Sequence, residues 1–154
     1  MRVDTLAPVA LDDPQETLAR WLTAAGCFWY PVDLDLPGPA MFIDANVDGE
    51  TVRLSSDPRD DDIHHVRASC RLGELPRGVA VPTLLQLLQA NLVMALRGQS
   101  QVLSLDVGED DAVYLSDALS VAPGGDAAFR LGLFHLASQA AAWREGRVFP
   151  HRPN

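Results

Sequence analysis

Two adjacent histidines, His64 and His65, are the residues of this sequence best suited by type to metal binding or acid–base catalysis. They could chelate one ion only if both rings pointed to the same side of the chain. The surrounding residues predict a strand, in which consecutive side chains point to opposite faces, so the two rings should diverge. We therefore expect neither a metal ion nor a catalytic histidine at this position.

Cys70 is a further candidate, because a thiolate with a nearby histidine base would be a nucleophile. Its place in the alternating pattern puts it on the apolar side of the strand, where a buried thiol is unreactive. Cys27 lies too far away in sequence to form a zinc knuckle or a redox pair with it. We interpret both cysteines as reduced packing residues.

The other sequence patterns that usually indicate chemistry are missing. The acidic loop with Asp57, Asp60, Asp61 and Asp62 has neither the alternating ligands nor the central glycine of a calcium-binding loop. The sequence contains no glycine-rich phosphate loop and no HExxH, CxxC or GxSxG motif. We therefore predict a protein without a cofactor and without enzymatic activity.

Charge and hydropathy limit the partners further. The 154 residues carry a net charge of −9, and all 12 basic residues are scattered arginines. A nucleic-acid-binding domain needs a basic patch, so we expect no nucleic-acid partner. No apolar run approaches the roughly 18 residues of a spanning helix, and no signal-like segment opens the chain, so we expect a cytoplasmic protein without membrane insertion.

The elements that position these residues follow from capping and periodicity. The sequence Asp13-Pro14-Gln15-Glu16 predicts the start of a first helix, which Gly26 ends, and the prolines from Pro31 to Pro39 predict an extended, irregular segment. Alternation and turn residues predict the other elements: strands at 41–47 and 52–54 joined by the turn Asp48-Gly49, strands at 63–72, 102–107 and 113–121, a helix at 81–97 and a final helix capped by Asp126. We predict a single α+β domain over residues 1–154 in the order α-β-β-β-α-β-β-α, with helices packed on a twisted antiparallel sheet and residues 148–154 frayed.

The helix at 81–97 is unusual because its only charged residue is the last one, Arg97. Its apolar residues cover an arc wider than the roughly 100° stripe of a helix that packs on one side. The helix therefore has apolar surface for two partners, its own sheet and a second copy of the chain. We predict a homodimer formed through this helix.

Several segments together resemble the class I chaperones of type III secretion, the Tir-chaperone family. The resemblance depends on Leu72-Gly73-Glu74-Leu75-Pro76, Leu84-Leu85-Gln86-Leu87-Leu88-Gln89-Ala90-Asn91-Leu92, Leu103-Ser104-Leu105-Asp106 and Val113-Tyr114-Leu115, followed by a last helix that ends near Trp143. It implies a small, acidic, bacterial cytoplasmic homodimer that holds the N-terminal segment of a secreted effector in extended form and presents it to the secretion apparatus and its ATPase. It also implies a dimer interface of Leu84, Leu85, Leu88, Leu92, Val93, Leu96, Leu103 and Leu105.

A protein that captures an extended segment needs exposed apolar anchors and sheet edges. The candidate effector-binding residues are Phe28, Trp29, Tyr30, Phe42, Val52 and Leu54. Two other classes remain open at this point: a dimeric adaptor or regulatory domain of the same fold without a secretion client, and a small enzyme with a sheet-lined pocket that uses His64 or His65.

Overall fold

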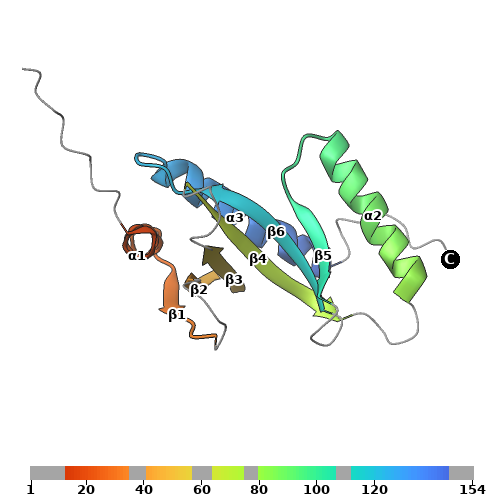
Figure 1. The fold of residues 1–154 in the computed structure, drawn as a ribbon, viewed down its shortest axis with the longest axis horizontal. Coiled ribbons are helices and arrows are strands. Elements are labelled where there is room, and N and C mark those ends of the chain that lie inside the picture. The colour runs from red at the N-terminus through yellow and green to blue at the C-terminus, as the bar shows by residue number, and fades with distance from the viewer. Residues whose placement is uncertain (1–12, 35–40, 57–63, 75–79, 107–111, 146–154) are drawn as a thin grey trace, which may run out of the picture.

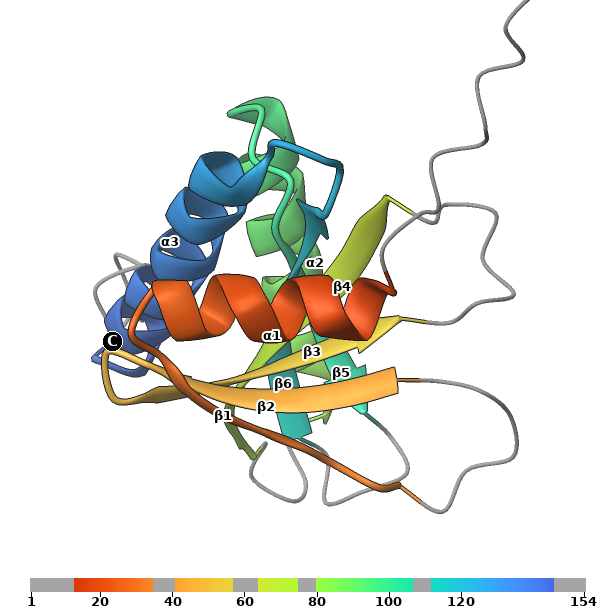
Figure 2. The ribbon, with the colours of Figure 1, turned by 90° about the vertical axis from the view of Figure 1, so that its left-hand side faces the viewer.

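A computed structural model describes residues 13–34, 41–56, 64–74, 80–106 and 112–145 of the chain. These residues form α1 (Pro14–Ala24), β1 (Phe28–Pro31), β2 (Met41–Val47), β3 (Glu50–Ser56), β4 (His65–Glu74), α2 (Ala80–Leu96), β5 (Val102–Asp106), β6 (Ala112–Ser120) and α3 (Asp126–Arg144). The strands make one antiparallel six-stranded sheet in the order β1-β2-β3-β4-β6-β5. The helix α2 lies beside the edge strand β5 (Figure 1), whereas α1 and α3 lie on the same side of strands β1, β2 and β3 (Figure 2).

The predicted α+β architecture and antiparallel sheet are confirmed, with one additional strand. The residues Phe28 to Pro31 form the edge strand β1, where the sequence predicts no strand. These four residues are three aromatic residues and a proline, so they show no alternation of apolar and polar side chains. This strand exists because its backbone pairs with β2 along the register Phe28–Asn46 to Pro31–Ile43.

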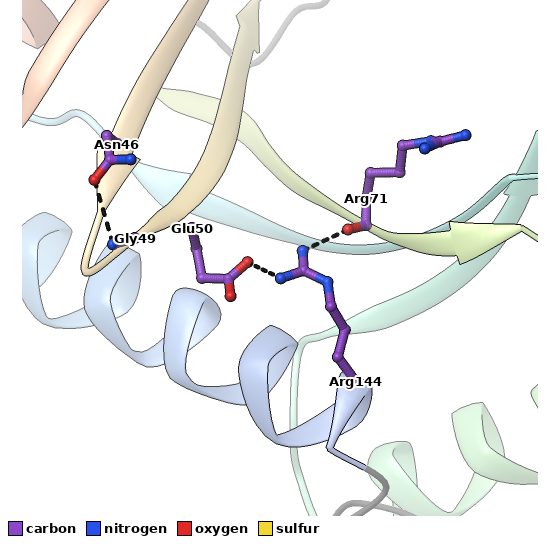
Figure 3. Close-up of polar contacts among 5 residues, drawn as sticks. All are labelled: Asn46, Gly49, Glu50, Arg71 and Arg144. Carbon is purple, nitrogen blue, oxygen red and sulfur yellow. Dashed lines mark hydrogen bonds and ion pairs between the residues drawn. The ribbon is translucent and has the colours of Figure 1, made fainter.

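The turn between β2 and β3 is the predicted two-residue hairpin. Asp48 and Gly49 both have positive φ, 52° and 85°, as a type I′ turn requires at its two central residues. The side-chain oxygen of Asn46 accepts a hydrogen bond from the Gly49 N–H at 3.2 Å (Figure 3). The turn therefore determines the register in which Val47 faces Glu50.

One row of residues crosses the whole sheet on the face covered by α1 and α3. The register places the following residues next to one another: Trp29, Ala45, Val52, Cys70, Leu115 and Leu103. All but the half-buried Trp29 are buried in the core. The predicted inward faces of β2 and β4 are confirmed, because Ile43, Ala45 and Val47 and likewise Val66, Ala68, Cys70 and Leu72 are all buried.

The helices α1 and α3 have different N-caps, and the C-terminal end of α3 is held by an arginine. Asp13 caps α1 as predicted, since its side chain accepts a hydrogen bond from the Gln15 N–H at 3.1 Å. The predicted cap of α3 is wrong by one residue: Gly125 is the N-cap, and Asp126 lies in the first turn, where its charge is favourable. At the other end of α3, the guanidinium of Arg144 pairs with Glu50 of β3 and donates to the carbonyl oxygen of Arg71 at 2.6 Å (Figure 3). The last turn of α3 is thereby tied to both β3 and β4.

Candidate interaction surface

The helix α2 is attached to the rest of the molecule by one narrow stripe of side chains. Among its described side chains, the buried apolar ones are Leu87, Ala90 and Met94, which follow helical spacing, and the element against which α2 mainly packs is β5. Asn91 lies on the same side, and its amide hydrogen-bonds to both backbone groups of Leu103. The packed side of α2 therefore occupies only a small part of its circumference.

Most of the remaining described side chains of α2 are apolar and exposed. We define the α2 apolar face as Val81, Leu84, Leu85, Leu88, Leu92, Val93 and Leu96. Leu88 is 64% exposed and Leu96 is 78% exposed. Each such side chain would contribute about 1.5–3 kcal/mol if it were removed from water. An apolar area of this extent on one helix is typical of a surface that contacts another protein.

The electrostatics of α2 reinforce this interpretation. The helix has no acidic residue in its first turn and no basic residue in its last turn, and no charged residue occurs between positions 80 and 96. The whole chain nevertheless carries a net charge of −9. The negative charge is therefore carried by other parts of the chain, and α2 is the helix that a second acidic molecule can approach with the least local repulsion.

Two residues predicted for a dimer interface do not lie on this face. Leu103 is only 4% exposed, because it belongs to the inward row of the sheet and is buried within the monomer. Leu105, two residues further along the same strand, is half-buried and packs against the same core. Leu103 therefore offers no side chain to another chain, and its assignment to the interface is wrong, whereas Leu105 keeps a partly exposed side chain and its assignment stays a prediction. The other six predicted residues are exposed on α2.

A second apolar area lies on β1. Phe28 is 74% exposed and Tyr30 is also exposed, and their ring centroids are 6.2 Å apart on the face of the sheet away from α1 and α3. Trp29 points to the opposite face, where its indole N–H donates to the hydroxyl of Thr23 on α1 at 3.0 Å. Phe42 is half-buried on β2. Phe28 and Tyr30 are therefore available to a partner, whereas Trp29 mainly holds β1 against α1.

The prediction that Val52 and Leu54 contact an effector is wrong. Both side chains are completely buried in the centre of β3. They face the helices, and they belong to the core that holds the sheet together. No partner can reach them without unfolding the domain.

A groove between α1 and α3 is a third apolar feature, and no sequence pattern predicts it. It has a volume of about 430 Å³ and is lined by Trp21, Ala24, Ala25, Asp126, Ala127, Arg130, Leu131 and Phe134. Leu131 is 74% exposed at its rim, and the guanidinium of Arg130 lies 5.8 Å from the centre of the Phe134 ring.

The histidine and cysteine candidates for chemistry lie in or next to β4, and they differ in exposure. His64 and His65 are exposed around the start of β4, and the backbone carbonyl of His64 accepts a hydrogen bond from the Val121 N–H at 2.6 Å. Cys70 is fully buried, and burial raises the pKa of its thiol to about 12. Across the described parts of the chain, no group of three histidine, cysteine, aspartate or glutamate side chains could hold a metal ion. The aspartates at positions 57, 60, 61 and 62 lie outside the described residues.

Within the described ranges, no helix is long and apolar enough to cross a membrane.

Both cysteines are buried free thiols, as the sequence predicts.

Comparisons with known proteins show a shared fold. The sequence matches no protein-family model and no curated protein. The structure is similar to that of an uncharacterized protein from Methanothermobacter thermautotrophicus, with a TM-score of 0.59 and 12% identity over 88% of this chain and 96% of the other. It is also similar to YbjN from E. coli, described as a candidate transcription regulator, with a TM-score of 0.53 and 19% identity over 88% of this chain and 95% of the other. At these identities the likeness establishes the fold alone.

Proposed function

We propose that the protein is a non-catalytic homodimer that binds an extended segment of a client protein. The observation that carries this proposal is the α2 apolar face, which is uncharged and exposed in an otherwise acidic molecule. Its proposed occupant is a second copy of the chain. Two molecules with a net charge of −9 repel each other over most of their surfaces, and the uncharged helix minimises that repulsion at the contact.

The client surface in this proposal is the area around Phe28 and Tyr30. These side chains remain exposed when α2 is covered, because they lie on β1 at the opposite edge of the sheet from β5. Exposed aromatic side chains are effective anchors for a partner, since each buries a large apolar area. The acidic remainder of the surface would keep a protein with such patches in solution.

The specific form of the proposal is a chaperone for a type III secretion effector in the bacterial cytoplasm. It is supported by the resemblance of the segments around Leu84–Leu92 and Leu103–Asp106 to the Tir-chaperone family. In this form the client is the N-terminal segment of a secreted protein, and the secretion ATPase is a further partner.

The second candidate is a dimeric regulatory or adaptor domain without a secretion client. The observation that favours it is the shared fold with YbjN, the candidate transcription regulator from E. coli. The two candidates differ in what the protein holds: a secretion chaperone co-purifies with a secreted protein in its native host, whereas a regulatory domain does not.

The dimer is tested by substituting leucines on the α2 apolar face. Leu88→Asp combined with Leu92→Asp should convert the dimer to a monomer, because a carboxylate cannot be buried there without a partner. Leu131→Asp is the control, since Leu131 is at least as exposed as Leu88 and Leu92 but lies on α3. Light scattering coupled to size exclusion measures the mass. A wild-type protein that is monomeric at micromolar concentration would refute the proposal.

Client binding is tested with the secreted protein recovered from the native host. Its N-terminal fragment is titrated by calorimetry against the wild type and against a variant with Phe28→Asp and Tyr30→Asp. We expect a large negative heat-capacity change for the wild type, because an extended segment becomes ordered and buries apolar surface, and at least about tenfold weaker binding for the variant.

The matched control for this titration is Thr51→Asp, which adds a carboxylate to the same face of the sheet on β3. Its affinity should equal that of the wild type. If the variant with Phe28→Asp and Tyr30→Asp bound as tightly as the wild type, the client would not bind at Phe28 and Tyr30. If no secreted protein were recovered from the host, the regulatory candidate would be favoured.

A further inference from the structure

The sheet has two outer strands, β1 and β5, and both carry backbone groups that point away from their single neighbours. Such groups attract other strands, so an open edge invites a partner to continue the sheet. A partner can join by backbone pairing only where the outward N–H and C=O groups of β1 or β5 are present and free to form hydrogen bonds.

The edge of β5 is filled by a side chain of α2. Leu103 faces Leu115 of β6, but its N–H donates to Asn91 Oδ1 at 2.7 Å and its carbonyl accepts from Asn91 Nδ2 at 2.9 Å. In an antiparallel ladder, every second residue directs both groups outward, and a further strand would bind them there. The Asn91 amide makes the same two hydrogen bonds that a seventh strand would make.

The edge of β1 is interrupted by a proline. The Val32 N–H donates to the carbonyl of Phe42 on β2 at 2.9 Å, so alternation directs the backbone groups of Tyr30 towards β2 and those of Trp29 and Pro31 outward. Proline has no N–H. A strand added at β1 would lack a hydrogen-bond donor at one of the outward positions.

We infer that Asn91 closes the β5 edge of the sheet to strand addition, and that Pro31 weakens such pairing at the β1 edge. A second copy that covers α2 then binds through side chains and does not extend the sheet at β5, and a client at the β1 edge cannot pair its backbone along the whole strand. This inference goes beyond the proposed function and holds whether or not the protein dimerises through α2.

The first test compares Asn91→Leu with Gln89→Leu. Both replace an amide with leucine on α2, but Gln89 is exposed, and the two side-chain hydrogen bonds to the backbone of Leu103 come from Asn91. Hydrogen exchange at the Leu103 amide should be roughly tenfold faster or more in Asn91→Leu and unchanged in Gln89→Leu, since a protecting hydrogen bond is lost only in the first. Unchanged exchange in Asn91→Leu would overturn the inference.

The second test measures assembly in a background that carries Leu88→Asp and Leu92→Asp, so that association through the α2 apolar face is removed. In this background, Asn91→Leu should form larger species whose mass rises with protein concentration, whereas Gln89→Leu should not. Equal masses for the two variants would show that Asn91 does not prevent strand addition at β5. Whether the protein dimerises through α2 is tested separately, by comparing the wild type with the variant that carries only Leu88→Asp and Leu92→Asp.

If Asn91→Leu does not fold, Asn91→Asp provides the same comparison. The aspartate keeps an acceptor for the Leu103 N–H but cannot donate to the Leu103 carbonyl. The Leu103 amide should stay protected, and assembly should still exceed that of Gln89→Leu. Loss of protection at Leu103 together with wild-type assembly would contradict the role assigned to Asn91.

Discussion

On the face of the sheet away from α1 and α3, Asp44 and Arg53 form a two-point ion pair between β2 and β3. The Arg53 Nε and Nη2 atoms lie 2.8 and 2.9 Å from the two carboxylate oxygens. The two partners differ in exposure, because the Asp44 side chain is 8% exposed and that of Arg53 is 42% exposed. The hydrogen bond to Asp44 raises the pKa of the Arg53 guanidinium above its usual value.

This difference predicts an asymmetric response to substitution. Arg53→Met should lower the free energy of unfolding by about 2–3 kcal/mol, because it leaves the Asp44 carboxylate nearly buried and unpaired. Asp44→Asn should cost only about 1 kcal/mol, since the exposed guanidinium can reach water. Urea unfolding of the two variants measures both values. Equal costs would contradict the argument.

Because the Cys70 thiol is buried, we predict that the folded state loses stability at high pH. Burial, and secondarily the charge of Glu50, raises the pKa of its thiol from 9.0 to about 12. An unfolded chain ionises this thiol near pH 9, whereas the folded chain keeps it neutral, so its contribution to stability is complete below pH 9 and is lost as the pH rises towards 12. The difference in unfolding free energy between wild type and Cys70→Ala should therefore shrink between about pH 8 and pH 11, measured by urea unfolding at each pH. A constant difference would show that the thiol is not protected.

At the scale of the elements, the hairpin of β2 and β3 and the end of α3 depend on each other. The turn at Asp48 and Gly49 brings Glu50 to the start of β3, where it pairs with Arg144 of α3. The second donor of Arg144 reaches the carbonyl of Arg71, next to the irregular register between Arg71 and Gly73 on β4. A local turn thus positions the partner of a distant helix end (Figure 3).

The positive φ of Gly49, 85°, makes this turn sensitive to substitution. Gly49→Ala should lower the free energy of unfolding by about 1–2 kcal/mol, because a Cβ atom disfavours the left-handed region. There is open space around the position, so a steric clash does not contribute. Asp48→Asn, which keeps a residue type suited to this turn, should change stability little. Thermal and urea unfolding of both variants check the difference.

At the scale of the whole molecule, two exposed apolar surfaces lie at opposite edges of the sheet. The α2 apolar face lies at the β5 end of the sheet, and the aromatic residues Phe28 and Tyr30 lie at the β1 end. A second copy that covers α2 therefore leaves the β1 end accessible. This separation is what a protein needs if it is to form a dimer and hold a client at the same time.

A dimer of this kind predicts that stability depends on protein concentration. The temperature of half-unfolding of the wild type should rise as concentration increases, because association stabilises the folded state by mass action. The variant with Leu88→Asp and Leu92→Asp should unfold at a temperature independent of concentration, and Leu131→Asp should behave like the wild type. Differential scanning calorimetry over a hundredfold range of concentration, roughly micromolar to 0.1 mM, measures this effect. A concentration-independent wild type would contradict the dimer.

The sequence by itself determined the features that depend on neighbouring residues. The cap at Asp13, the turn at Asp48-Gly49 and the alternation in β2 and β4 predict elements that the structure confirms. The uncharged stretch of α2 likewise predicts apolar surface for two partners, because its apolar arc is wider than the roughly 100° stripe of a helix that packs on one side. These inferences work because helical and strand periodicity relate each side chain to others only a few positions away.

Only the tertiary structure decided which apolar residues remain in contact with water. Leu103 looks as apolar as Leu88 in the sequence, but it lies in the inward row of the sheet and is buried. The strand β1, the groove between α1 and α3, and the hydrogen bonds from Asn91 to Leu103 all join segments that the local pattern does not connect. Burial is a property of strand order and helix placement, so a residue's type predicts that it should be covered but not what covers it.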